Sequence, residues 1–208
     1  MSQKIYFNLR FFIYLKIMTK LRLIIFKIFF LTIGLLIFSN VLSSFENKKF
    51  PLSSKEKRIL QNLRITPANI RLEAKDFSAE DSDGVLVSLK DFQGKFVLLN
   101  FWATWCYPCL KEMPDLEKAY KNLGKENLSV LAIAMGESVE KIKKFSKKNT
   151  VSFPLLSDEN MVITKLYGVK NIPITYLIDP EGILLGRALG IRDWSSNELM
   201  EFIRSRLE

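Results

Sequence analysis

Two cysteines, Cys106 and Cys109, are the residues of this 208-residue chain best suited to do chemistry. They are its only cysteines, and two residues separate them. A C-x-x-C pair is typical of thiol–disulfide exchange or of half a metal site. Because the chain has no histidine and no further cysteine, the other ligands of a zinc site are missing. We therefore predict a redox-active pair and neither a metal nor another cofactor.

The position of the pair along the chain favours this chemistry. An apolar run over residues 96–102 predicts a buried strand, and a helical pattern follows from about Cys106. The N–H groups and positive dipole end of a helix N-terminus stabilise a thiolate, which is the form that attacks a disulfide. Pro108 suits the first helical turn, and Cys109 lies about one turn further on, where it can resolve a mixed disulfide. A purely structural disulfide over so short a loop would stabilise little.

The residues from about 70 onward predict an α/β domain around this site. Apolar runs alternate with segments of helical periodicity, and this order favours a mixed central sheet flanked by helices. We expect strands over residues 96–102, 128–135, 174–178 and 183–188, and helices after Cys106, over 138–148 and 160–167, and from Ser195 onward.

The N-terminal segment has a different composition. Residues 1–66 carry 12 Lys/Arg and 2 Asp/Glu, which leaves 19 basic and 20 acidic residues of the chain's 31 and 22 for the remainder. Residues 28–45 carry no charge. A basic segment followed by an apolar one is typical of a signal peptide or a membrane-spanning helix, so we do not expect a nucleic-acid partner.

We therefore divide the chain into three parts. Residues 1–45 are predicted to form a membrane anchor or signal segment, residues 46–69 a tether, and residues 70–208 the domain. The domain is expected on the periplasmic or extracytoplasmic side of the cell membrane, or free in the periplasm after cleavage. The sequence does not decide between cleavage and anchoring, or between Met1 and Met18 as the start.

The sequence around the cysteines resembles the thioredoxin superfamily, and in particular its TlpA/ResA branch of exported thiol–disulfide oxidoreductases. The resemblance extends over about residues 70–206 and implies a thioredoxin-like fold. It is carried by the run Asn100-Phe101-Trp102-Ala103-Thr104-Trp105-Cys106-Tyr107-Pro108-Cys109, by Glu112-Met113-Pro114, by Ser88-Leu89-x-Asp91-Phe92-x-Gly94-Lys95 and by Gly190-x-x-Asp193-Trp194.

The resemblance also implies roles for individual residues. Cys106 would be the attacking thiol and Cys109 the resolving one. Pro173 matches a cis-proline that faces the active site, and the backbone of Ile172 before it would pair with an extended substrate. The expected substrate-binding residues are Trp105, Tyr107, Pro108, Ile172 and Pro173.

Two polar positions separate this chain from ordinary thioredoxin. Asn100 stands where thioredoxin has a buried aspartate, so that proton acceptor is missing. Glu112 matches the acid that the exported branch places near its cysteines, and we expect it to handle the proton of Cys109. The alternative is a surface glutamate in an ordinary ion pair.

The resulting hypothesis is an exported reductase of protein disulfides. The family implies a membrane thiol as electron donor, and substrates such as apocytochrome c or a copper-site assembly protein of cytochrome oxidase. Two alternatives remain, a peroxiredoxin-like thiol peroxidase and a non-catalytic binding or chaperone module on the same fold. The sequence leaves open the substrate, the donor, the direction of electron flow and the oligomeric state.

Overall fold

The computed structural model describes residues 29, 31–34, 52–124, 127–149 and 151–207. Residues 50–208 form one compact unit and residues 1–49 a second, of which only the helical residues 29 and 31–34 are described. The predicted anchor or signal segment, residues 1–45, therefore lies almost wholly outside the described residues. Within the described ranges, none of the helices has both the length and the apolar character needed to cross a bilayer.

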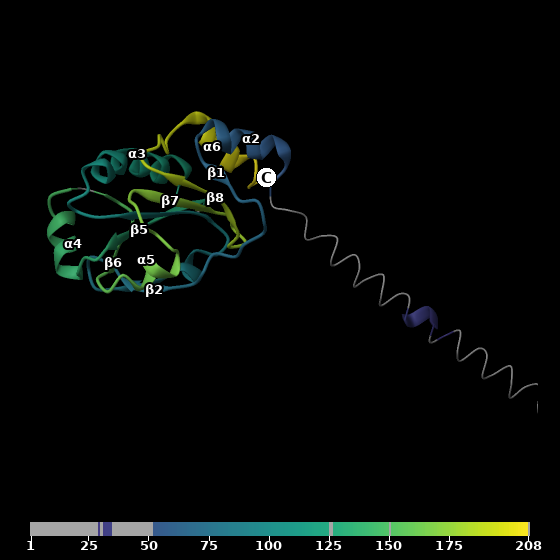
Figure 1. Cartoon of the computed structure of the whole chain (residues 1–208), viewed down its shortest axis with the longest axis horizontal. Coiled ribbons are helices and arrows are strands. Elements are labelled where there is room, and N and C mark those ends of the chain that lie inside the picture. The colour runs from purple at the N-terminus through teal and green to yellow at the C-terminus, as the bar shows by residue number, and fades with distance from the viewer. Residues whose placement is uncertain (1–28, 30, 35–51, 125–126, 150, 208) are drawn as a thin grey trace, which may run out of the picture. The chain divides into compact units, whose positions relative to one another are not determined.

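A six-stranded mixed sheet forms the centre of the domain, in the order β1-β8-β7-β4-β5-β6 (Figure 1). The strands β4, β5 and β6 are parallel, whereas β7 is antiparallel to both β4 and β8. The predicted mixed sheet is thus confirmed. The strands of this sheet are β1 (Thr66–Pro67), β4 (Phe96–Trp102), β5 (Leu128–Met135), β6 (Leu155–Asp158), β7 (Ile174–Ile178) and β8 (Leu184–Leu189), and a separate hairpin pairs β2 (Ser78–Glu80) with β3 (Leu86–Ser88).

Helices cover both faces of the sheet. In Figure 1, α2, α3 and α6 lie on one side of it, and α5 and β2 lie on the other. Two hydrophobic cores result, the first with side chains of α2, α3, α4 and α6 and the second with those of α5 and β2. The helices are α2 (Ser54–Asn62), α3 (Tyr107–Leu123), α4 (Val139–Ser146), α5 (Val162–Leu166) and α6 (Asn197–Arg204), with a 3-10 turn, η1, over Leu89–Phe92.

The central strand β4 holds the two cores together. All seven of its residues are buried. Because side chains alternate across a strand, Leu98 and Trp102 enter the first core while Leu99 and Phe101 enter the second. The strand is therefore packed on both faces, and this packing fixes the position of its carboxyl end, from which the cysteine loop begins.

The segment that we expected to be a tether, residues 46–69, is packed on the domain from Leu52 onward. Ser53 and Glu56 form a capping box at the start of α2. Leu52, Leu60 and Ile65 are buried in the first core, and β1 then pairs with β8 at the edge of the sheet. The domain thus begins before residue 70. The prediction missed this because the apolar side chains are spread among charged ones, and only tertiary packing shows that they share a buried face.

Candidate active site

The cysteine pair lies where β4 leads into α3, as predicted. Cys106 is the N-cap of α3, and the backbone N–H of Cys109 donates to its Sγ at 3.3 Å. Pro108 is the second residue of the helix, where its missing N–H leaves no hydrogen bond unmade. A disulfide joins the two cysteines, and both are nearly buried. The structure is thus that of the oxidised pair at a helix N-terminus.

The turn before Cys106 is held by a buried carboxylate. Glu137, which follows β5, accepts hydrogen bonds from the backbone N–H of Thr104 at 2.9 Å and from its hydroxyl at 2.7 Å. Lys141 lies 2.7 Å from the same carboxylate. The N–H of Cys106 donates to the carbonyl of Ala103 at 3.1 Å and closes the turn. Glu137 therefore fixes the loop that presents Cys106.

Glu112 is fully buried on α3, one turn after Cys109. Its Oε1 accepts a hydrogen bond of 2.6 Å from the indole Nε1–H of Trp194 and one of 3.0 Å from the backbone N–H of Arg192. Its Oε2 accepts a third, of 3.2 Å, from the side-chain amide of Asn100. The alternative of a surface glutamate in an ordinary ion pair is therefore wrong.

Burial decides the ionisation of Glu112. Removal from water disfavours the charged form and raises the pKa from 4.5 to about 7. The donors Trp194, Arg192 and Asn100 favour the carboxylate and oppose this rise without overcoming it. At neutral pH both forms of Glu112 are populated, so the group can accept or release a proton.

Asn100 connects Glu112 to the proline loop. Its amide donates to Glu112 and also to the hydroxyl of Thr175, at 2.9 Å. Thr175 is the second residue of β7, directly after the loop that contains Pro173. The Ile172–Pro173 peptide bond is cis, as the resemblance implied. One polar network thus joins α3, β4 and the loop before β7.

A shallow groove of about 540 Å³ lies beside the disulfide. Four of the five predicted substrate-binding residues line it, and the fifth, Pro173, follows Ile172 in the chain. Trp105 and Tyr107 expose about two thirds of their surface, and the ammonium group of Lys111 lies 4.6 Å from the ring centroid of Tyr107. The residues lining the groove are Trp105, Cys106, Tyr107, Pro108, Met135, Lys170, Asn171 and Ile172.

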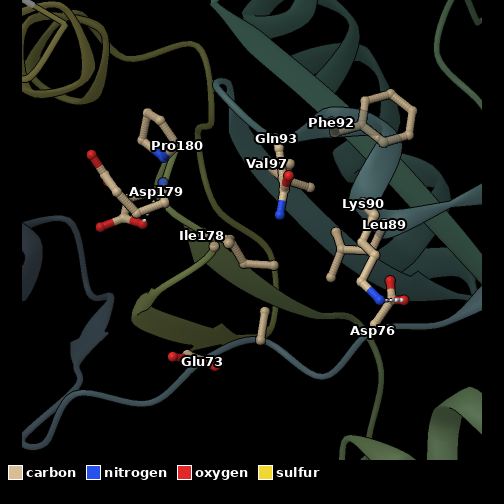
Figure 2. A pocket seen from close by; sticks show the side chains of 13 residues that line it. Glu73, Asp76, Leu89, Lys90, Phe92, Gln93, Val97, Ile178, Asp179 and Pro180 are labelled. Atoms are coloured by element: carbon tan, nitrogen blue, oxygen red, sulfur yellow. Dashed lines mark hydrogen bonds and ion pairs between the residues drawn. The ribbon is translucent and has the colours of Figure 1, made fainter.

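A second cavity, of about 340 Å³, lies at the opposite end of β4 (Figure 2). Val97, near the start of that strand, contributes to it, whereas the cysteines follow the strand's other end. Lys90 and Asp76 form an ion pair of 2.9 Å at this cavity. Figure 2 shows Leu89 beside that pair. No cysteine lines this cavity, so it is separate from the redox site.

Sequence reasoning missed several residues of the site, among them Glu137 and Arg192. Glu137 is the second residue after β5, and parallel neighbouring strands such as β4 and β5 end at the same edge of a sheet, so its proximity to the cysteine loop could have been predicted. Arg192 bonds Glu112 through its backbone N–H, so no side-chain pattern could have indicated that contact. Among the described residues, no group of three or more acidic or cysteine side chains is arranged to hold a metal ion.

Comparison with known proteins places these residues in a family. The AhpC/TSA family model matches residues 70–186. The thiol-disulfide oxidoreductase ResA of Bacillus subtilis (strain 168) is 39% identical over 110 residues, which are 53% of this chain and 62% of that protein. ResA of Bacillus thuringiensis subsp. konkukian is 36% identical over 132 residues, or 64% of this chain and 75% of that one. A thiol:disulfide interchange protein from Chlorobium tepidum TLS superposes with a TM-score of 0.59 at 25% identity, over 68% of this chain and 99% of that one.

Proposed function

Because this chain belongs to the AhpC/TSA family and to the ResA type of thiol-disulfide oxidoreductases, we propose that it reduces disulfides in substrate proteins through Cys106 and Cys109. The observation that carries the proposal is the cysteine pair at the start of α3 with a buried acid one turn behind it. The helix N-terminus favours the thiolate of Cys106, and Glu112 is placed to take up a proton.

The exchange takes place in two steps. In the reduced protein, the Cys106 thiolate attacks one sulfur of the substrate disulfide, so that a mixed disulfide forms and one substrate thiolate leaves and is protonated. Cys109 then transfers its proton to the Glu112 carboxylate, and its thiolate attacks Sγ of Cys106. The second substrate sulfur leaves as a thiolate and is protonated, two electrons have passed to the substrate, and the Cys106–Cys109 disulfide forms again.

The groove beside the disulfide suits an extended protein segment. Trp105 and Tyr107 offer exposed aromatic surface on either side of Cys106, and Ile172 lies on the facing loop. Such a segment would lay its backbone along Ile172 and Pro173 with its disulfide over Cys106. The flexible thioether of Met135 in the groove would adapt to different neighbours of the target cysteine.

The cellular setting is part of the proposal. The basic N-terminal segment and the uncharged residues 28–45 support export and anchoring in the cell membrane, with the domain on the extracytoplasmic side. Disulfides persist there, so a reductase needs electrons from a thiol donor in the membrane. Substrates of the cytochrome c maturation or cytochrome oxidase copper-site type fit this role.

Mixed-disulfide trapping tests the proposal. Full-length Cys109→Ser should accumulate a covalent complex with a disulfide-containing substrate protein, because no thiol remains to resolve it. Full-length Cys106→Ser should trap nothing, although it retains Cys109. Equal trapping by both variants, or none by Cys109→Ser, would overturn the assignment of Cys106 as the attacking thiol.

The family match keeps a thiol peroxidase as the second candidate, since the AhpC/TSA model covers the same residues. In that case reduced Cys106 would be oxidised by peroxide faster than by a protein disulfide. Peroxide consumption, measured beside disulfide exchange on the same preparation, separates the two functions. Peroxide turnover that exceeds exchange would replace the reductase proposal.

A further inference from the structure

Arg192 connects the active-site acid to the N-terminal helix α2. Its backbone N–H donates to Oε1 of Glu112 at 3.0 Å. Its guanidinium donates from Nε and Nη2 to the carbonyl of Arg64, at 3.1 and 2.9 Å. A single residue thus bonds the buried carboxylate with its main chain and, with its side chain, the residue that follows the C-cap of α2.

The acceptor at the end of α2 is held firmly. Arg64 has a φ of +56°, in the left-handed region, and its N–H donates to the carbonyl of Gln61. The next residue, Ile65, is buried and donates to the carbonyl of Leu60, which is buried as well. Two hydrogen bonds from a charged fork to one fixed carbonyl are strong and directional.

The loop of residues 190–194 supplies two of the three donors to Glu112. They are the N–H of Arg192 and the indole of Trp194, and both reach Oε1. The loop is joined to the proline loop by the N–H of Gly190, which donates to the carbonyl of Pro173. Arg192 is the member of this loop whose side chain reaches α2.

From these contacts we infer that Arg192 is a positioning residue that couples helix α2 to Glu112 and thereby sets where the acid titrates. The inference rests on the proposed role of Glu112 in exchange. Arg64 and Arg192 both lie outside residues 70–186, the part that the family model matches.

The charges around Glu112 give the sign of the effect. The guanidinium of Arg192 favours the ionised acid. Burial and the positive charge of Arg64 lower the pKa of Arg192, and the charge of Glu112 opposes them. The side chains that hydrogen-bond to Glu112, Asn100 from β4 and Trp194, are neutral, and Cys109 one turn before it is held in the disulfide. Loss of the Arg192 side chain would remove a positive charge and loosen one donor. Both changes raise the pKa of Glu112 further.

Titration of the oxidised full chain tests the coupling directly. The indole Nε1–H of Trp194 donates to Glu112, so its NMR shift reports the ionisation of the acid. The wild type should show a transition that Glu112→Gln abolishes. Arg192→Ala should move the midpoint upward. Arg192→Lys should move the midpoint less, since lysine keeps the positive charge but lacks the paired N–H donors of the guanidinium. Arg64→Ala is the matched control, because it leaves the carbonyl acceptor in place and should leave the midpoint near that of the wild type.

Two results would overturn the inference: an unchanged midpoint in Arg192→Ala, or an equal displacement in Arg64→Ala. If Arg192→Ala does not fold, Arg192→Lys and Arg192→Gln decide, and a wild-type midpoint in both refutes the coupling. Exchange rates measured against pH provide a second test. Arg192→Ala should change the pH profile when it is made in the wild type, and should leave the profile unchanged when it is made in the Glu112→Gln variant. If Glu112→Gln itself exchanges like the wild type, the proposed role of Glu112 fails while the Trp194 titration still reports on the coupling.

Discussion

Replacing Glu112 by glutamine should remove a pH-dependent loss of stability near neutrality. The folded protein raises the pKa of this group from 4.5 to about 7, because burial disfavours its charge. The folded state therefore binds the proton more tightly than the unfolded one. The stability that this provides is complete below pH 4.5 and is lost as the pH rises through 7. The shift corresponds to about 3 kcal/mol of the free energy of unfolding.

Glutamine cannot ionise, so the Glu112→Gln variant should lack this loss. Its side-chain oxygen can still accept from Trp194 and Arg192, while its amide now faces the amide of Asn100. Asn100 can turn its oxygen toward the new amide, and the hydroxyl of Thr175 can donate in its place. We expect a cost of about 1 kcal/mol at pH values near 5. Above a pH of about 8 the order should reverse, with Glu112→Gln the more stable protein by about 2 kcal/mol.

Denaturant unfolding of the oxidised protein between about pH 5 and 8.5 measures this effect. The disulfide keeps both cysteines from titrating, and the chain has no histidine. Glu117→Gln on the same helix is the control. Burial alone would raise the pKa of Glu117, but hydrogen bonds from Lys121 and Ser152 outweigh it and leave the pKa below its ordinary value. Its contribution is present above the ordinary pKa of a glutamate and is lost only as the pH falls, so Glu117→Gln should differ from the wild type by a constant amount between about pH 5 and 8.5.

If the free energies of unfolding of wild type and Glu112→Gln differ by the same amount at every pH in this range, the assignment of a raised pKa to Glu112 is refuted. That outcome would mean that Glu112 is ionised throughout, and that its three donors outweigh burial. The exchange mechanism would then need another proton acceptor for Cys109.

Three further substitutions test other parts of the structure. Glu137→Ala removes both acceptors of Thr104 and should slow disulfide exchange about tenfold in stopped-flow measurements, since a lost buried hydrogen bond is worth about 1–2 kcal/mol. Glu137→Gln should recover part of the rate. Trp105→Ala should raise KM for a protein substrate about fivefold and leave the rate with a small uncharged disulfide unchanged, because the indole is 68% exposed in the groove. Leu60→Ala should lower the free energy of unfolding by about 2–5 kcal/mol in urea, since its side chain is fully buried; a change below about 0.5 kcal/mol, the size expected at a surface position, would contradict the packing of α2.

The buried strands could be predicted from the sequence, because an apolar run of this length between turn residues has few alternatives to a buried strand. The expected strands over residues 96–102, 128–135 and 174–178 coincide with β4, β5 and β7. The helices after β5 and β6 are shorter than expected by a few residues, which is usual at helix ends. The short strand β1 could not be predicted, because two residues carry no periodicity and depend on β8 for their place.

The parts of the candidate site that are adjacent in the sequence could be predicted. The cysteines, Pro108 and the helix they begin follow from local sequence alone. The burial of Glu112 does not follow from local sequence, because α3 also carries charged residues on its exposed face. Only the contacts with Asn100 and Trp194 show that Glu112 lies on the buried face. Contacts between residues far apart in sequence, such as Thr104 with Glu137, depend on strand register and loop packing.

The buried acid also makes this protein suited to vibrational spectroscopy. A carboxylic acid that keeps its proton in a dry interior absorbs apart from ionised carboxylates and from the amide backbone. Among the described carboxylic acids, the pKa is raised at Glu112 and Asp179. Asp179 follows the end of β7 that pairs with Val97, far along the sheet from the disulfide, so reduction should leave its signal unchanged. An infrared difference spectrum recorded on reduction would therefore show directly whether a proton moves to or from Glu112 as the electrons arrive.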